Sequence, residues 1–183
     1  MRRTITAFLV LFSFNVFAAQ ITVDFADPNI PVDGLEEGFE TQGYSFTFEP
    51  VPIPFPPAYI STGSGELAFC PTCDMVMESA NGASFSLYSF EGWIFGSPAD
   101  FQVTGFLEGG GTVTETFAFD DVKTLYEFDW SDLSFTSIKF DNFGGDPSIL
   151  DNLVVSEVPV PAAVWLFGSA LAGLGWFRRR RTT

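Results

Sequence analysis

The sequence predicts an all-β protein: a single antiparallel β-sandwich, jelly-roll-like, flanked by an N-terminal signal peptide and a C-terminal transmembrane helix. Three observations lead to the sandwich. Short segments rich in Phe, Val, Ile and Thr recur along the chain, turn residues separate them, and 23 phenylalanines can supply its core. Many short strands at such spacing are typical of two packed antiparallel sheets.

The N-terminus has the layout of a secretory signal peptide. Two arginines form a charged start, residues 5–17 are mostly apolar, and Ala18 and Ala19 offer small residues for cleavage. The apolar stretch is short for a membrane span. We therefore assign residues 1–19 to a signal peptide, which implies the export translocon and signal peptidase as partners.

Residues 20–157 form the predicted exported domain, in which we expect nine strands. They cover residues 20–25, 44–49, 74–79, 83–90, 100–108, 112–119, 125–129, 134–140 and 149–155. Three glycines at 109–111 indicate a hairpin, because glycine reaches positive φ at low steric cost. Apolar and polar residues alternate on both of its arms, as in a half-buried sheet. Five prolines within residues 50–57 indicate an extended surface loop.

The predicted domain is strongly acidic. It keeps only Lys123 and Lys139 as cations, whereas all 23 acids of the chain lie between Asp24 and Glu157. Two lysines against 23 acids give it a formal charge of −21. Such a charge repels nucleic-acid phosphates, so we expect no nucleic-acid partner. A charge of this size is compatible with three roles: solubility alone, cation binding, or residence in a polyanionic matrix. All three stay open at the level of composition.

The C-terminal segment, residues 158–183, has the composition of a membrane-inserted helix. Its residues 158–177 carry no charge and, at about 1.5 Å per helical residue, just cover the roughly 30 Å hydrocarbon core. Four arginines follow: Arg178, Arg179, Arg180 and Arg181. Such a cluster stays on the cytoplasmic side, so the sequence predicts that the domain lies outside the inner membrane.

This segment resembles the PEP-CTERM protein-sorting domain of exported bacterial proteins. The resemblance rests on three parts: the motif Val158, Pro159, Val160 and Pro161, the apolar helix with small residues, and the arginine run. Pro-Val-Pro replaces the usual Pro-Glu-Pro, as in the VP-x-PA variant of the signal. The resemblance implies processing by an exosortase-type membrane protease or transpeptidase. An ordinary single-span anchor is the alternative.

The last predicted strands, within 135–143 and 149–155, resemble the closing strands of jelly-roll domains common in PEP-CTERM proteins. Those domains resemble carbohydrate-binding modules in outline. Together the two resemblances imply an exported, non-enzymatic protein of the cell surface or extracellular matrix, associated with polysaccharide. The alternative is a membrane-tethered, lectin-like carbohydrate-binding module or a small hydrolase on the same fold.

The residue types present in the chain argue against a catalytic site. The chain has no histidine, which excludes Ser-His-Asp and Cys-His nucleophilic sites and His-ligated zinc. The glycines at 109–111 are not followed by Lys-Ser or Lys-Thr, so the run is not a phosphate-binding loop. Carboxylate pairs of the glycosidase kind arise by chance among 23 acids. We expect no catalytic residue and no cofactor apart from structural calcium.

Cys70 and Cys73 are the two cysteines of the chain. In the oxidising compartment that export implies, they are expected to form a local disulfide. The alternative, an active dithiol, needs a helix after the motif to lower the pKa of the first thiol, whereas residues 75–78 are expected in a strand.

Two further groups of residues are candidate sites. Oxygen-bearing side chains suited to calcium occur at Asp141, Asn142, Asp146 and Asp151, for which a polar turn without metal is the alternative. Trp93 and Trp130 are candidate platforms for stacking on sugar rings, with burial in the core as the alternative.

Overall fold

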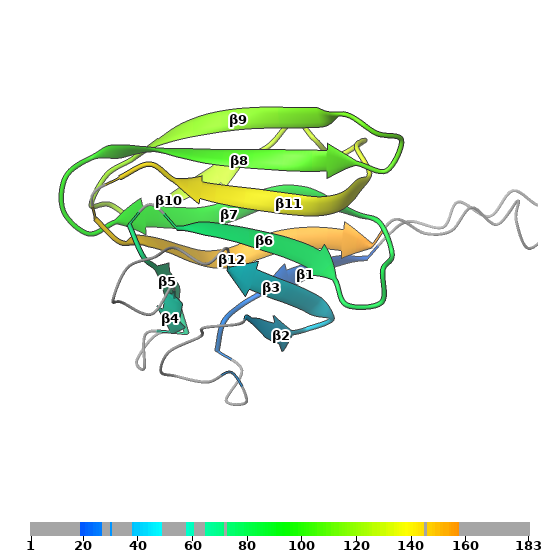
Figure 1. Cartoon of the computed structure of the whole chain (residues 1–183), viewed down its shortest axis with the longest axis horizontal. Coiled ribbons are helices and arrows are strands. Elements are labelled where there is room, and N and C mark those ends of the chain that lie inside the picture. The colour runs from blue at the N-terminus through cyan, green and yellow to red at the C-terminus, as the bar shows by residue number, and fades with distance from the viewer. Residues whose placement is uncertain are drawn as a thin grey trace, which may run out of the picture. The chain divides into compact units, whose positions relative to one another are not determined.

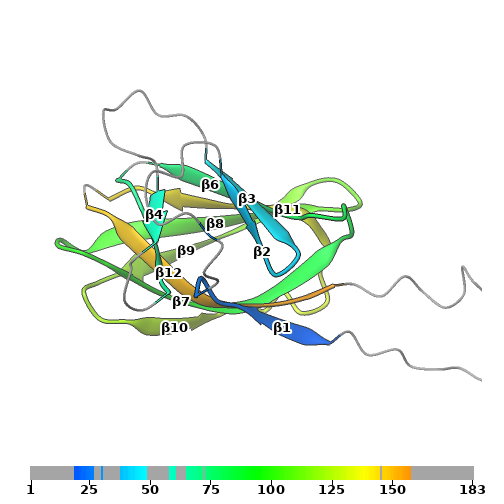
Figure 2. The ribbon, with the colours of Figure 1, turned by 90° about the horizontal axis from the view of Figure 1, so that it is seen from below.

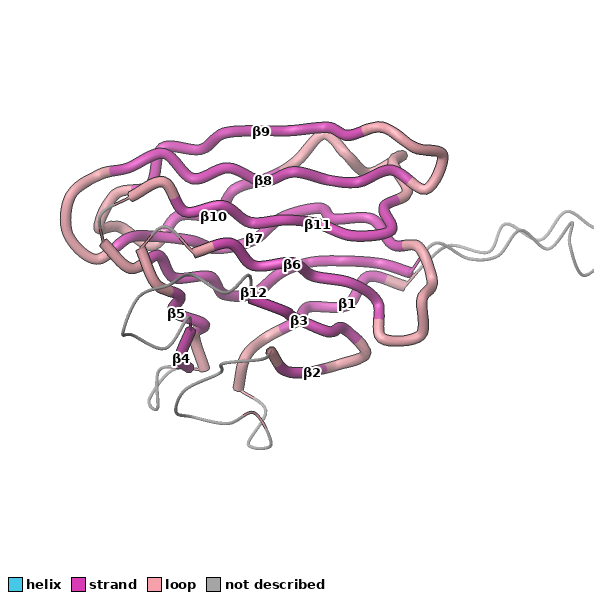
Figure 3. The backbone as a smooth tube through the Cα atoms, in the orientation of Figure 1, coloured by secondary structure: helices cyan, strands magenta, loops and turns pink. Residues whose placement is uncertain are grey.

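Two antiparallel sheets face each other in the structure (Figure 1). The computed structural model describes residues 19–26, 30, 38–48, 58–60, 65–71, 73–144 and 146–157. Over these ranges the chain forms strands and loops without a helix, as the tube in Figure 3 shows. Alternation of apolar and polar residues is one cause: in strands such as Tyr44–Phe48, Asp74–Ser79 and Ala99–Leu107, buried residues alternate with more exposed ones.

The sheet nearer the viewer in Figure 1, here the front sheet, has the strand order β2-β3-β6-β11-β8-β9. Its strands are β2 (Phe39–Thr41), β3 (Tyr44–Phe48), β6 (Asp74–Ser79), β11 (Phe135–Asn142), β8 (Ala99–Leu107) and β9 (Thr112–Phe119). The register from β6 across β11 and β8 to β9 is continuous, apart from one shift between Phe135 and Ser137.

The back sheet has the order β10-β7-β12, and both β1 and β5 pair along the far side of β12. Its strands are β10 (Thr124–Glu127), β7 (Phe85–Ile94), β12 (Ser148–Glu157), β1 (Gln20–Val23), β5 (Leu67–Phe69) and β4 (Ala58–Ile60), the last pairing with β5. A single bridge, Phe135 to Phe85, joins the two sheets. Figure 2 shows the two layers from below, with β10, β7, β12 and β1 in one of them.

The connections make this sandwich a jelly roll. From β6 onward the chain alternates between the sheets, and among these connections only the β8–β9 hairpin stays within one sheet. Each sheet is therefore built from strands that are distant in sequence, which is the jelly-roll arrangement. The predicted all-β antiparallel sandwich is confirmed.

All nine expected strands are present, with differences at their ends. The strand expected at 83–90 is β7 and continues to Ile94, and the strands at 134–140 and 149–155 extend to Asn142 and Glu157. Three short strands, β2, β4 and β5, were not expected. Each has three residues, too few for a periodic pattern to identify.

Aromatic rings fill the space between the sheets. Phe90 of β7 is fully buried and lies at the centre of a cluster. Its ring centroid is 5.3–6.3 Å from those of Phe101, Phe117, Phe119, Tyr126, Phe128 and Phe140. Phe101 and Phe119 stack at 4.2 Å across the front sheet. Contacts of this kind add to the burial of apolar area. Eleven of the described phenylalanines are buried in the core, whereas Phe95, Phe106 and Phe143 are exposed.

Three expected segments lie outside the described residues: the signal peptide, the proline-rich loop at 50–57 and the C-terminal helix with its motif from Val158 to Pro161 and its arginines. Among the residues that the structure describes, no helix is long and apolar enough to cross a membrane.

Candidate functional site

The outer face of the front sheet carries a registered array of polar side chains, which we call the front grid. Three rows of aligned residues cross β6, β11, β8 and β9. The rows are Glu78-Ser137-Phe106-Thr112, Val76-Lys139-Thr104-Thr114 and Asp74-Asp141-Gln102-Thr116. These residues alternate along each strand with core residues such as Met77, Phe140 and Val103, so the strand period itself brings them to one face.

Lys139 lies near the middle of the front grid between two carboxylates. Its Nζ donates to Asp74 Oδ2 at 2.6 Å and to Asp141 Oδ1 at 2.8 Å. Asp74 and Asp141 are paired across β6 and β11, so the ammonium bridges neighbouring strands. The lysine and both acids are at least two-thirds buried, so solvent screens their attraction less than in an exposed ion pair, while burial also disfavours their charged forms.

The proximity of the two acids and the lysine shifts the pKa values of Asp141 and Lys139. Burial and a hydrogen bond with Asp74 raise the pKa of Asp141 to about 6, although Lys139 opposes the shift. Burial by itself would lower the pKa of Lys139, but its bonds to Asp141 and Asp74 raise that pKa overall. The lysine is therefore a fixed cation, and Asp141 exchanges a proton in the mildly acidic range.

Hydroxyl and amide groups make up the β8–β9 side of the front grid. Thr104 and Thr114 share a hydrogen bond of 3.2 Å, and Gln102 Nε2 donates to Thr116 Oγ1 at 3.5 Å. Phe106 adds an apolar ring that is 38% exposed. Short side chains with donors and acceptors can bond to hydroxyl-rich ligands, and the flat arrangement suits an extended one.

A second ionic cluster lies on the outer face of the back sheet around Lys123. Its Nζ lies 2.6 Å from Asp151 Oδ2, 2.9 Å from Glu91 Oε2 and 3.8 Å from Glu66 Oε1. Asn152 also donates to Glu91 Oε2, at 2.8 Å. Hydrogen bonds from Asn152 and then Lys123 lower the pKa of Glu91. Both lysines of the domain thus bind acids rather than stand free, which leaves the rest of its surface anionic.

The four predicted calcium ligands do not come together. Asp141 bonds to Lys139 in the front sheet, Asp151 bonds to Lys123 in the back sheet, and Asp146 accepts from the Ser97 N–H at 2.9 Å. The described residues contain no group of three acids or cysteines that could hold a metal ion. Calcium binding stays an untested prediction, and these oxygens have protein partners.

Asn142, the fourth of these residues, connects two loops. Its side chain is 2% exposed, donates to the Cys70 and Asp146 carbonyls at 3.2 and 3.1 Å, and accepts from the Gly144 N–H at 2.9 Å. It therefore holds the turn after β11 against the loop that begins at Cys70. Cys70 and Cys73 form the expected disulfide in that loop, directly before β6 and Asp74 of the front grid.

The burial of both tryptophans corrects the prediction of sugar-stacking platforms. Trp130 is 7% exposed and stacks on Phe128 at 4.3 Å within the core. Trp93 is 9% exposed and packs with Ala68 and Ile149 on the outside of the back sheet, with Lys123 Nζ 5.0 Å from its ring. Neither indole offers an open face to a ligand, because other side chains already cover it.

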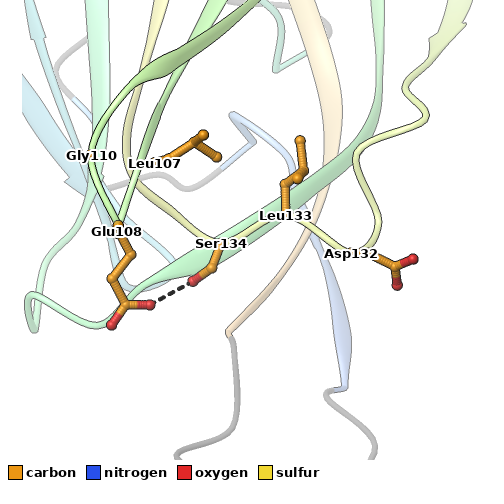
Figure 4. Close-up of a pocket in the computed structure, with 7 residues that line it drawn as sticks. Leu107, Glu108, Gly110, Asp132, Leu133 and Ser134 are labelled. Carbon is orange, nitrogen blue, oxygen red and sulfur yellow. Dashed lines mark hydrogen bonds between the residues drawn. The ribbon is translucent and has the colours of Figure 1, made fainter.

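A shallow depression of about 580 Å³ lies at the tip of the β8–β9 hairpin (Figure 4). Its lining comes from residues 107–110 of the hairpin and residues 132–134 before β11. The Ser134 hydroxyl donates to Glu108 Oε2 at 2.9 Å, so the polar groups of the two segments bond to each other. This arrangement ties the hairpin to the neighbouring turn, and the front grid remains the better candidate for binding.

Sequence reasoning missed the front grid because it depends on register between strands distant in sequence. Two signals pointed toward it. The alternating threonines after the glycine turn marked one polar face, and Lys139 stood out as one of the two cations of the predicted domain, against its 23 acids. Neither signal showed that Lys139 lies beside Asp74, since β6 and β11 are separated by four other strands in the sequence.

The segment that follows the sandwich matches a known family model. Residues 157–181 match the family model of the PEP-CTERM protein-sorting motif, starting at the last residue of β12. The resemblance of this segment to the PEP-CTERM sorting domain is confirmed, and the VP-x-PA variant stays a prediction. The match covers the sorting segment and not the domain, so it leaves the function of the sandwich to be inferred from its own surface. No curated protein matches the chain.

Solved structures similar to the sandwich include carbohydrate-binding modules. CBM29_1, a family 29 module from Piromyces equi, is 12% identical, with a TM-score of 0.51, over 78% of this chain and 93% of that one. A variant of CBM29-2 complexed with cellulohexaose is 19% identical, with a TM-score of 0.51 and the same coverage. A variant complexed with mannohexaose is 18% identical, with a TM-score of 0.50, over 77% and 93%. At these identities the likeness shows the fold.

Proposed function

We propose that this chain is an exported, non-enzymatic protein that an exosortase-type system sorts to the cell surface or extracellular matrix. The observation that carries the proposal is the PEP-CTERM match at residues 157–181, which begins at the last residue of β12. The apolar segment would hold the precursor in the inner membrane with its arginines in the cytoplasm. Exosortase would then cut or transfer the chain near Pro159 and release the acidic sandwich.

We further propose that the sandwich associates with extracellular polysaccharide through the front grid. Support comes from the chemistry of the grid, where hydroxyl, amide and carboxylate groups lie in register around one lysine. The fold supports it as well, since the similar structures include carbohydrate-binding modules. The grid lacks an open tryptophan, so hydrogen bonds rather than stacking would supply affinity, and binding would be weak for each domain.

The intact mass of the protein from the culture medium and from the membrane tests the sorting proposal. We expect a released product that begins near Ala19 or Gln20 and ends near Pro159. A membrane-bound product that still carries Thr183 would show that the tail is a plain anchor. The same comparison with Arg178, Arg179, Arg180 and Arg181 replaced by Ser should show impaired retention or orientation, because the charge that fixes topology is gone.

Binding to immobilised extracellular polysaccharide of the producing cells tests the role of the grid. We expect the double variant Gln102→Ala and Thr104→Ala to lose about tenfold in apparent affinity, the effect of removing about one net hydrogen bond. Thr22→Ala, an exposed change on β1 of the back sheet, is the matched control and should bind normally. Equal binding by all three proteins would remove the grid from the proposal and leave the sorting proposal intact.

A further inference from the structure

The front grid divides into two halves of different chemistry. Its charged residues all lie on β6 and β11: Asp74, Glu78, Lys139 and Asp141. The half on β8 and β9 carries no charge, and we call it the uncharged strip. It consists of three residues of β8 and their partners on β9: Gln102, Thr104, Phe106, Thr116, Thr114 and Thr112. A ligand of the grid therefore meets ions over one pair of strands and uncharged groups over the other.

The ionic half offers no strong site to a charged ligand. An ammonium between two carboxylates makes strong, charge-assisted hydrogen bonds. Here the protein's own Lys139 takes that place, with its Nζ 2.6 Å from Asp74 Oδ2 and 2.8 Å from Asp141 Oδ1. A carboxylate of a ligand would gain little from Lys139, because the charge of the lysine is already opposed by two acids. Charged groups on a ligand therefore find neither an open anion pair nor an open cation in this half.

The uncharged strip presents groups that suit a chain rich in hydroxyls. A threonine hydroxyl can donate one hydrogen bond and accept two, so the 3.2 Å bond between Thr104 and Thr114 leaves further capacity on both side chains. The β9 threonines are exposed and follow one another at every second residue, about 6.8 Å apart along the strand. Phe106, 38% exposed, adds a ring on which the C–H face of a sugar can pack. The strip can thus bind a sugar chain without using charge.

The surroundings of the strip oppose an anionic chain. Asp100 lies two residues before Gln102, so it faces the same side of β8, and Glu108 directly follows that strand at its other end. Both acids are exposed. The whole domain has a formal charge of −21, and its two lysines are held in ion pairs. A polymer with a carboxylate on each unit would meet this repulsion along its entire contact, whereas an uncharged polymer would not.

We propose that the front grid binds uncharged polysaccharide and rejects polysaccharide that carries carboxylates. This inference rests on the proposed association with polysaccharide and adds the class of ligand. Hydroxyls of the ligand bond to Gln102 and the threonines, while a sugar ring packs on Phe106. The acids around the strip add no attraction for this ligand but repel anionic chains. In a matrix that contains both kinds of polymer, the domain therefore associates with the uncharged one.

Retention of the full chain in detergent on fractionated polysaccharide tests the selectivity. Ion exchange divides the extracellular polysaccharide of the producing cells into uncharged, anionic and cationic fractions, and each is immobilised. We expect retention on the uncharged fraction, with an apparent dissociation constant that changes less than about twofold between about 0.1 and 1 M NaCl. Binding to the anionic fraction at about 0.1 M NaCl should be at least about tenfold weaker, because repulsion is then least screened.

Two phenylalanine variants show whether the strip is the site. Phe106→Ala should weaken binding to the uncharged fraction about fivefold or more, because the sugar ring loses its apolar contact. Phe95→Ala is the matched control and should bind like the wild type, since Phe95 is 56% exposed but follows β7, outside the grid. The double variant Gln102→Ala and Thr104→Ala supplies a second loss that does not depend on the ring.

The outcomes separate this inference from the proposed function. Binding that is equal or stronger on the anionic or cationic fraction, and that Phe106→Ala weakens, would overturn the selectivity but leave the association with polysaccharide intact. Binding to none of the fractions would overturn both proposals. So would binding that neither Phe106→Ala nor the double variant weakens, because the grid would then not be the site.

Discussion

At the scale of single residues, Asn142 makes the clearest contribution to stability. Its buried amide bonds three main-chain groups in two loops. Asn142→Ala should lower the free energy of unfolding by about 3 kcal/mol, because those groups lose their partner in the interior. Asn81→Ala, an exposed change that also removes hydrogen bonds, should cost less than about 1 kcal/mol. Urea unfolding of both variants measures these free energies. Similar losses of stability in the two variants would contradict the prediction.

Asp141 should give the sandwich a distinctive dependence on pH. Its pKa rises to about 6 in the folded protein, above its usual value, because burial and Asp74 disfavour the charged form. The folded state therefore takes up the proton more readily than the unfolded chain. The resulting stabilisation is fully present below about pH 4 and is lost as the pH rises through about 6.

Asp141→Asn should remove this dependence, because the amide resembles the protonated acid. We expect the variant to be at least as stable as the wild type near pH 7.5, with Lys139 still bonded to Asp74. Unfolding curves of both proteins between pH 4 and 7.5 measure the pH dependence of stability. The ¹³C shift of the Asp141 carboxyl in the wild type measures its pKa. A titration midpoint of the Asp141 carboxyl near pH 4 would show that the effect of Lys139 on its pKa outweighs those of burial and Asp74.

At the scale of elements, the pairing of β12 with β7 is irregular around one residue in the left-handed region. The register between β12 and β7 shifts between Asp151 and Val154, and Asn152 has a φ of 47°. Asparagine tolerates this left-handed conformation better than other non-glycine residues. Asn152→Ala should cost about 2 kcal/mol, whereas Asn152→Gly should recover about 1 kcal/mol of it by relieving the backbone. Equal stabilities of the two variants in urea would show that the side-chain bond to Glu91 accounts for the whole loss.

The elements also show how far sequence reasoning reaches. Strands with clear alternation, such as the hairpin arms β8 and β9, were predicted almost residue for residue. The prediction failed at β7, which was expected to end at Phe90 but continues through Gly92 to Ile94. The structure gives the reason for this glycine: a Cβ there would lie 2.5 Å from the Phe119 ring, so the position serves close packing within a continuous strand. Trp93 is therefore a strand residue against Ile149, not an exposed loop residue.

Sites are harder to predict than strands because they depend on pairing. The composition showed two cations among many acids, but the partners of Lys139 and Lys123 follow from the register of β11 with β6 and of β12 with β7. The same holds for the predicted calcium ligands, which are close in sequence but are divided between two sheets. A polar residue near a turn can face either sheet, and only the topology decides which.

At the scale of the whole molecule, the chain enters and leaves the sandwich at one end. Gln20 at the start of β1 pairs with Ser156 near the end of β12. The sorting motif begins at Glu157, the last residue of that strand. Cleavage near Pro159 would thus leave every strand intact, and Ala19–Val158 form one compact unit by their contacts. The domain should not need its tail once it has folded.

This boundary gives a final prediction about truncation. An exported chain that ends at Val158 should keep the unfolding free energy of the full-length sandwich, within about 0.5 kcal/mol. A chain that ends at Asn152 loses Leu153 and Val155, both fully buried, together with the pairing to β1. Losses of about 2–4 kcal/mol for each side chain approach the whole stability of a small domain, so this chain should not fold. Urea unfolding and limited proteolysis compare the two, and a destabilised chain ending at Val158 would show that the sorting segment supports the sandwich.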